Sequence, residues 1–261
     1  MNNEQLANTE QLSMKAEKRL APGESGTRAD LGTYFESSLG SPTDRLANFP
    51  KFVARPELAT FIARYEIFKH VLHVPGAIVE CGVHLGGGLM TWAHLSSIFE
   101  PYGHYRRIYG LDTFSGFAGI APEDAAPVEN EHLHVGGLAS GAELDVRRAI
   151  ELYDRNRPLS HIKRVELVVG DACKEIPLFV ERTPQLVVGL LYLDFDVYEP
   201  TLTALEHLVP LMPKGAVLAF DELNDERYPG ETVAVLKTVG LRNLRIQKFS
   251  FEPRISFAIL E

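Results

Sequence analysis

The sequence has little of what several classes of protein require. Among its 261 residues there are only two cysteines, Cys81 and Cys173, too few and too far apart for a zinc site or a disulfide framework. No apolar run approaches the ~20 residues of a membrane-spanning helix. Residues 1–20 are polar and mixed in charge, without the apolar centre of a signal peptide. We therefore expect a cytoplasmic protein with no membrane partner.

Basic residues are also in the minority. The 26 Lys and Arg residues face 35 Asp and Glu residues, which gives a formal net charge of −9. Nucleic acids and anionic membranes both favour a basic surface, so neither is expected as the main partner. Hydrophobic residues make up 45% of the chain, which is enough to bury a substantial core.

The chain before residue 76 divides into two parts. Residues 1–45 are rich in Ser, Gly, Glu, Asn and Thr and show no sustained periodicity. We predict an arm that is disordered alone or ordered by a second copy of the chain, and hence a homo-oligomer. Residues 46–75 are expected to form a helical lead-in that begins at Pro56. Its apolar residues recur at helical spacing and are expected to pack on the core: Leu58, Phe61, Ile62, Tyr65 and Phe68.

Residues 76–261 are predicted to form one doubly wound α/β domain. Apolar strands are predicted at residues 77–83, 107–112, 165–170, 186–194 and 216–221, and helices at residues 89–99, 143–154, 173–181, 199–211 and 232–239. This alternation is typical of a mostly parallel sheet with helices on both faces. Two final strands, 244–251 and 254–260, are close enough to form only an antiparallel hairpin. The segment from about 113 to 142 is too long for an ordinary loop and is interpreted as an active-site lid.

The first strand leads into a glycine turn. Gly82, Val83 and Gly86 belong to it, and His84 stands where the dinucleotide fingerprint would need a second glycine. Glu80 precedes the turn, and its carboxylate suits a cationic ligand better than a pyrophosphate. The alternative is a tight turn with no ligand.

Single acids end the second and third strands. In an open α/β sheet, ligands bind outside the carboxyl ends of the strands. Asp112 could accept hydrogen bonds from the ribose of an adenosine-containing cofactor, or it could be an exposed or helix-capping residue. Asp171 could accept from the adenine amine or cap the next helix.

The fourth and fifth strands end in several acids. Asp194 and Asp196 follow one strand and Asp221 and Glu222 the other, and these ends are neighbours in a doubly wound sheet. Converging carboxylates need a cation or protons, and Mg²⁺ is the ion that best fits an oxygen site with open positions. The alternatives are helix caps for Asp196 and Asp221, or a solvated acidic rim.

The sequence resembles the macrocin O-methyltransferase type of natural-product sugar methyltransferases. Three stretches carry the resemblance: Val79–Val83 with Gly86-Gly87, Leu111–Phe117, and Leu193–Thr201 with Phe220–Glu222. The resemblance covers about residue 55 to the end. It implies a seven-stranded class I methyltransferase fold, S-adenosylmethionine and Mg²⁺ as cofactors, and a small-molecule acceptor, a deoxysugar on a glycosylated natural product.

The resemblance also implies roles for single residues. Asp194, Asp221 and Glu222 would bind the metal, and Asp196 would be the general base. Glu222 stands where members commonly have a second aspartate, which changes its reach by one methylene. Cofactor contacts would come from Glu80, Gly82, Val83, Gly86, Asp112, Thr113, Ser115, Asp171 and Ala172. The lid histidines His132 and His134 are alternative bases, although a loop histidine is more often solvated.

Other functions compete with this interpretation. A metal-dependent methyltransferase of a catechol-like phenol would use the same chelating acids. Asp194-Phe195-Asp196 could instead be the D-x-D motif of a glycosyltransferase, which would leave Glu222 and the Glu80 turn unexplained. An NAD-dependent oxidoreductase lacks its fingerprint here, and a non-catalytic platform would not need the acids at both strand ends.

Overall fold

The computed structural model describes residues 26–261, and their contacts divide the chain into two units, Met1–Ala59 and Thr60–Glu261. The described part of the first unit contains α2 (Thr27–Ser37), α3 (Pro42–Ala47) and a 3₁₀ helix, Phe49–Lys51. Sequence periodicity did not predict α2 and α3, because neither helix has a buried residue and so neither needs an apolar face. The predicted arm also includes residues 1–25, which lie outside the described residues.

Helix α4 (Arg55–Val71) leads into the second unit, and its predicted buried face is correct in part: Phe68 is fully buried and Tyr65 packs on the core. The prediction placed Phe61 and Ile62 on the core, but their side chains are 43% and 46% exposed. The face that packs on the core runs instead through Ala63, Ile67 and Val71, which are fully buried. Small residues such as Ala63 allow a helix to approach a sheet closely, and a ranking by side-chain size overlooks them.

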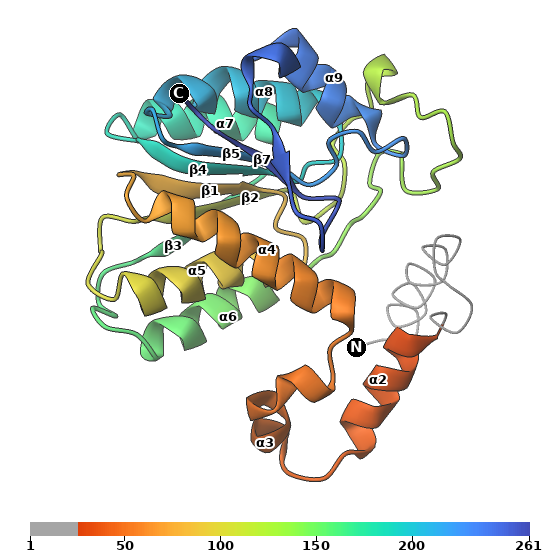
Figure 1. Cartoon of the computed structure of the whole chain (residues 1–261), viewed down its shortest axis with the longest axis vertical. Helices are drawn as coiled ribbons and strands as arrows, with labels where there is room; N and C mark the ends of the chain where they lie inside the picture. Colours follow the sequence, from red (N-terminus) through yellow and green to blue (C-terminus); the bar gives the residue numbers. More distant parts are fainter. Residues whose placement is uncertain (1–25) are drawn as a thin grey trace. The chain divides into compact units, whose positions relative to one another are not determined.

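The second unit is built on a seven-stranded sheet, which confirms the predicted fold class (Figure 1). The spatial order is β3-β2-β1-β4-β5-β7-β6, with parallel pairing from β3 to β5 and antiparallel pairing at β7 and β6. The strands are β1 (Ala77–Cys81), β2 (Ile108–Asp112), β3 (Val165–Val169), β4 (Val188–Leu193), β5 (Val217–Phe220), β6 (Gln247–Lys248) and β7 (Ser256–Ile259). Every residue of β1, β4 and β5 is buried, as expected for central strands covered on both faces.

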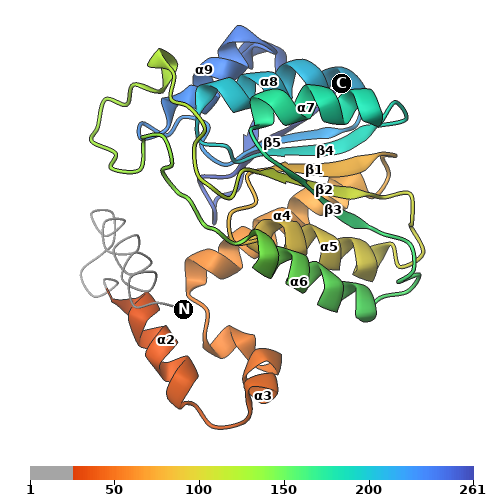
Figure 2. The same cartoon turned by 180° about the vertical axis from the view of Figure 1, so that it is seen from behind.

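Helices cover both faces of the sheet. Helices α4, α5 (Gly87–Phe99) and α6 (Glu143–Arg155) lie on one face (Figure 1). Helices α7 (Ala172–Arg182), α8 (Tyr198–Leu208) and α9 (Pro229–Lys237) lie on the other, which Figure 2 shows from behind. Each face has its own cluster of buried apolar residues. Three 3₁₀ helices complete the regular structure: Pro122–Asp124, Val209–Leu211 and Leu241–Asn243.

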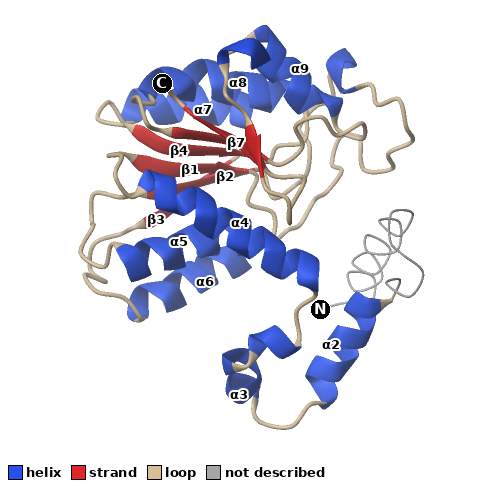
Figure 3. Ribbon diagram, in the orientation of Figure 1, coloured by secondary structure: helices blue, strands red, loops and turns tan. Residues whose placement is uncertain are grey.

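The C-terminal strands pair antiparallel as predicted, but they are much shorter (Figure 3). Only two residue pairs join them, Gln247 with Phe257 and Lys248 with Ser256. The connection between the two strands therefore runs from residue 249 to residue 255 and is longer than the two residues left between the predicted strands. The Glu252 carboxylate accepts a hydrogen bond from the Thr60 hydroxyl at 3.0 Å.

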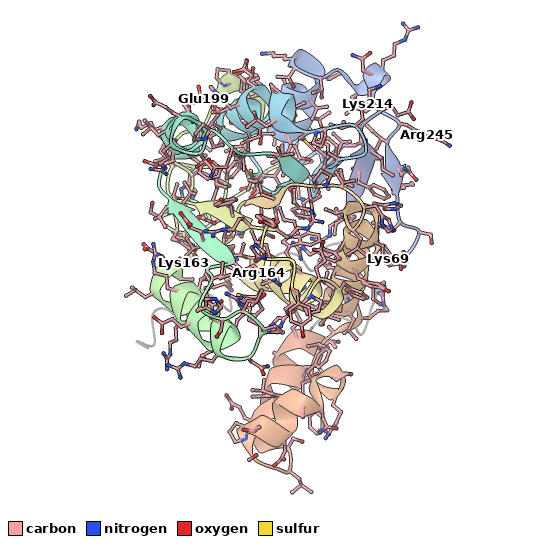
Figure 4. The ribbon with its side chains drawn as sticks, turned by 90° about the vertical axis from the view of Figure 1, so that its left-hand side faces the viewer. Lys69, Lys163, Arg164, Glu199, Lys214 and Arg245 are labelled. Carbon is pink, nitrogen blue, oxygen red and sulfur yellow. The ribbon has the colours of Figure 1, made fainter. Side chains whose placement is uncertain are left out.

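Basic side chains differ in their surroundings even where they are adjacent in sequence. Figure 4 labels Lys163, which is exposed, and Arg164, whose side chain is buried. Arg164 donates to the carbonyl oxygens of Glu100 and Pro101, so it ties the start of β3 to the end of α5. Within residues 26–261, no helix is long and apolar enough to cross a membrane.

Candidate active site

The strand order reverses between β1 and β4, and the carboxyl ends of these strands open into a cavity of about 460 Å³. Open α/β sheets bind ligands at such a switch point, and the volume suits a small-molecule site. The cavity is lined from the glycine turn after β1, the turn after β4, the segment after β5 and residues 113–142. The predicted site residues that line it are Gly82, Asp112, Thr113, Asp171, Ala172, Asp194, Asp196, Asp221 and Glu222.

The glycine turn is shaped by close packing against β4. Gly82 has φ +97°, and a Cβ atom there would lie 1.9 Å from the carbonyl oxygen of Asp194. Gly86 has φ +87° and directly precedes α5. A Cβ atom on Gly86 would lie 2.9 Å from the side chain of Val146. Gly86 and Val83 support the turn without lining the cavity. Glycine at position 82 therefore lets the backbone of β1 approach the end of β4.

Substituting Gly82 with alanine should destabilise the fold by about 2–5 kcal/mol, because a left-handed L-residue and overpacking against backbone each contribute. Urea denaturation measures this loss. Gly87→Ala is the matched control: a Cβ there has no neighbour within 4 Å, and alanine favours the first turn of α5. Equal stability of the Gly82→Ala protein and the native protein would contradict the packing argument.

Asp112 organises the same turn. Its Oδ2 accepts from the backbone N–H groups of Val83 and His84, each at 2.7 Å, and its Oδ1 accepts from Phe114 at 2.6 Å. Its carboxylate thus joins the end of β2 to the glycine turn and still lines the cavity. Of the two residues that follow in the predicted site, Thr113 lines the cavity and Ser115 is exposed outside it.

Asp171 caps α7, one of its two predicted roles. Its Oδ1 accepts from the backbone N–H of Cys173 at 3.1 Å. Lys174 lies 2.9 Å from its Oδ2, and this hydrogen bond lowers the pKa of Asp171. Asp171 and Ala172 both line the cavity, so capping and a ligand contact are compatible at this position.

Three acids converge where β4 and β5 end. Asp194, Asp221 and Glu222 each offer a carboxylate oxygen within 4.8 Å of the others. Asp221 is 8% exposed and Glu222 9%, so the alternative of a solvated rim does not fit these two. The helix-cap alternative also fails for Asp221, which accepts a hydrogen bond from the Tyr192 hydroxyl at 2.6 Å.

The electrostatics of this triad fit a divalent cation. Burial, and next the charge of Asp221, raise the pKa values of Asp194 and Glu222 well above their usual range. Glu222 Oε2 is buried and has no hydrogen-bond partner. Buried carboxylates with an unsatisfied oxygen are costly unless a cation or proton meets them. A hard ion with oxygen ligands, such as Mg²⁺, matches this donor set.

Asp196 lies in a left-handed turn between β4 and α8, with φ +64°. Aspartate tolerates this conformation better than most residues. Val197, rather than Asp196, is the cap residue of α8, so the carboxylate is not used as a helix cap and lines the cavity. Burial, followed by the nearby Asp221, raises the pKa of Asp196 to about 8.

Sequence reasoning missed two buried charged residues beside the triad. Glu231, on α9, is fully buried, and its Oε1 accepts from the backbone N–H of Glu222 at 3.2 Å. Arg64, on α4, lies 3.7 Å from Glu80 and 3.8 Å from Asp194. Both residues come from helices, so a search limited to the carboxyl ends of strands does not find them.

The predicted lid lines the cavity, but its two histidines do not take part. Gly116 to Gly119, Gly137 and Leu138 line the cavity, whereas His132 and His134 do not. The segment is tied to α8 by Asp124, whose Oδ1 accepts from the backbone N–H of Tyr198 at 2.7 Å. Farther along, the Asn130 amide donates to the carbonyl oxygen of Arg227 at 2.9 Å.

Known proteins resemble the chain in sequence. The family model for macrocin-O-methyltransferase (TylF) matches residues 65–236. A curated relative from Streptomyces olivaceus is 29% identical over 157 residues: 8-demethyl-8-(2,3-dimethoxy-alpha-L-rhamnosyl)-tetracenomycin-C 4'-O-methyltransferase. The match covers 57% of this chain and 53% of the relative, so the chain spans about half the length of that protein.

Solved structures are similar over nearly the whole chain. The crystal structure of CalS11, a calicheamicin methyltransferase, matches with a TM-score of 0.88 and 30% identity, covering 94% of this chain and 96% of that one. An apo structure of CalS11, described as a TDP-rhamnose 3'-O-methyltransferase, matches with a TM-score of 0.80, again with 30% identity, over 92% and 96% of the two chains. The O-methyltransferase NovP shares the fold at 18% identity, with a TM-score of 0.56 over 77% and 79%. With the family model spanning most of its α/β unit, the chain belongs to the macrocin-O-methyltransferase family.

Proposed function

We propose that this protein is an S-adenosylmethionine- and Mg²⁺-dependent methyltransferase that methylates a hydroxyl of a deoxysugar on a natural product. The observation that carries the proposal is a cavity that joins the glycine turn to the three converging acids Asp194, Asp221 and Glu222. Family membership excludes the glycosyltransferase and oxidoreductase alternatives.

The cofactor residues fit a ligand with a cationic amino-acid end and a nucleoside end. Glu80 is 1% exposed, and burial raises its pKa to about 8, partly offset by Arg64. Glu80 lies behind the glycine turn and does not line the cavity, but its Oε2 has no hydrogen-bond partner and would accept from an ammonium group. Asp112 would accept from the ribose, and Asp171 with Ala172 would lie beside the adenine. S-adenosylmethionine, when bound, supplies an electrophilic methyl group on its sulfonium.

The acids at the ends of β4 and β5 would have two separate roles, metal binding and proton transfer. Asp194, Asp221 and Glu222 would hold Mg²⁺, which supplies Lewis-acid polarisation of a bound hydroxyl oxygen. Asp196 would accept the proton of the acceptor hydroxyl at its carboxylate, because its raised pKa lies close to a working pH. The cavity walls would orient the sugar, and alignment contributes much of the rate in such a transfer.

A nucleotide-activated sugar is a second candidate acceptor. CalS11 is described as acting on TDP-rhamnose, whereas the Streptomyces olivaceus relative is described as acting on a rhamnosyl tetracenomycin. Two arginines, Arg227 and Arg254, line this otherwise acidic cavity and could face a diphosphate. They are also paired within the chain, Arg227 with Asp225 at 2.6 Å and Arg254 with Glu252 at 3.2 Å. These pairings favour the glycosylated natural product.

Acceptor profiling tests the proposal. The protein is incubated with S-adenosylmethionine and Mg²⁺ together with a rhamnosylated aglycone, TDP-rhamnose or a catechol, and products are identified by mass spectrometry. Methylation of the rhamnosylated aglycone, lost in EDTA, is the expected result. Methylation of the catechol alone would contradict a sugar acceptor, and methylation of TDP-rhamnose alone would move the reaction before glycosyl transfer.

A further inference from the structure

Arg64 is a buried cation between the two halves of the site. It comes from α4, and its side chain is 12% exposed. One guanidinium nitrogen, Nη2, lies 3.7 Å from Glu80 Oε1 and 3.8 Å from Asp194 Oδ2. The same guanidinium nitrogen therefore lies near both Glu80, the proposed partner of the cofactor, and Asp194, a proposed metal ligand.

The surrounding residues make room for this arrangement. A Cβ atom on Gly88, in the first turn of α5, would lie 1.9 Å from Glu80 Oε1 and 2.9 Å from Arg64 Nη2. The Arg64 guanidinium also lies over the ring of Tyr192, 4.9 Å from its centroid. The hydroxyl of the same tyrosine donates to Asp221 at 2.6 Å. Arg64 thus contacts one acid of the triad directly and supports a second through Tyr192.

We propose that Arg64 is a positioning residue shared by the cofactor site and the metal site, an inference that rests on the proposed function. Glu80 and Asp194 are like charges at the ends of neighbouring strands, and they repel each other. A guanidinium between them holds both carboxylates in place and leaves each of them an oxygen for its own ligand. The protein thereby orients two acids toward two different cations with one side chain.

Arg64→Met tests this role, because methionine keeps much of the apolar stem and removes the charge. We expect the Kd values for S-adenosylhomocysteine and for Mg²⁺, measured separately by calorimetric titration, each to rise about tenfold or more. Losses of about 10–100-fold in metal affinity are usual when residues that orient metal ligands are removed. Arg64→Lys keeps the charge but ends short of the Nη2 position, so it should recover part of both affinities.

Tyr192→Phe separates the effect on the metal site from the effect on the cofactor site. It keeps the ring under the guanidinium and removes only the hydrogen bond to Asp221. We expect weaker Mg²⁺ binding with a Kd for S-adenosylhomocysteine within threefold of the native value. Weakening of both affinities in Tyr192→Phe would contradict the separation.

Arg106→Met is the matched structural control. Arg106 is buried, pairs with Glu100 at 2.7 Å and donates to the carbonyl of Val71, but it does not line the cavity. Its loss should lower the melting temperature and leave both Kd values unchanged.

The outcomes separate this inference from the proposed function. If the native protein fails to bind S-adenosylhomocysteine, the proposed function itself is wrong. If it binds, and a folded Arg64→Met protein has unchanged affinities or a tighter affinity for Mg²⁺, only the role of Arg64 is overturned. If Arg64→Met does not fold, Arg64→Gln decides, because it also removes the charge but keeps a polar side chain: native affinities in that variant contradict the inference.

Discussion

Asp194→Ala is expected to reduce Mg²⁺-dependent methyl transfer about a thousandfold or more. Asp194 directly follows the central strand β4 and offers an oxygen within 4.8 Å of those of Asp221 and Glu222, so its loss leaves the triad with two acids. Polarisation by a metal ion contributes several kcal/mol to a transition state, which corresponds to a rate factor of this size. The Kd for S-adenosylhomocysteine should change less than about threefold, because Glu80 and Asp112 remain.

Initial rates with and without EDTA, together with calorimetric titration, check this expectation. Glu151→Ala is the control, since it removes one exposed acid from α6 and should leave rate and binding unchanged. Full activity of the native protein in EDTA would exclude the metal role of the triad. Activity in Asp194→Ala that still depends on Mg²⁺ would place the ion elsewhere.

Asp196→Asn is expected to lower kcat about 10²–10⁴-fold, the usual contribution of a positioned general base. The substitution keeps size and polarity but cannot accept the proton. Because Asp196 is separate from the three acids that converge, the affinities for Mg²⁺ and S-adenosylhomocysteine should stay within a few-fold of native values.

The rate of methyl transfer should also depend on pH in a way that identifies Asp196 as the base. Burial raises the pKa of Asp196 to about 8, and a base works only when it is ionised, so the rate should rise with pH toward 8. A bound cation nearby favours the carboxylate, so Mg²⁺ should move the midpoint to lower pH. Asp196→Asn should lose this rise.

Lid variants provide the comparison. His132→Gln and His134→Gln should keep the native pH profile, because neither imidazole lines the cavity. A profile abolished by either histidine variant and unchanged in Asp196→Asn would assign the base to the lid.

The convergence of the three acids could be predicted because topology determines where strand ends meet. Asp194 and Asp221 end buried apolar runs, and parallel neighbours bring such ends to one edge of the sheet. The same logic could not find Arg64 or Glu231. Which face of a helix points inward depends on its packing, and the misplaced inward face of α4 at Phe61 has the same cause. Helices α2 and α3 bury no residue, so no periodic signal could indicate them.

The length of the C-terminal hairpin could not be predicted from the sequence either. Residues 244–251 were predicted to form one strand, yet only Gln247 and Lys248 pair with β7. The rest of the connection is determined by a contact distant in sequence, between Glu252 and Thr60. Alternation indicates that a segment can pair, whereas tertiary contacts determine how much of it does.

The contact between Gly82 and the carbonyl oxygen of Asp194 also bears on how such an enzyme can diverge. The glycine turn and the chain after β4 lie so close together that a Cβ atom at position 82 would require one of them to move. Residues 116–119, 137 and 138 line another part of the cavity, in a segment without strands that is not held by this contact. Under the proposed function, we expect changes of acceptor to arise in that segment more readily than at the glycine turn.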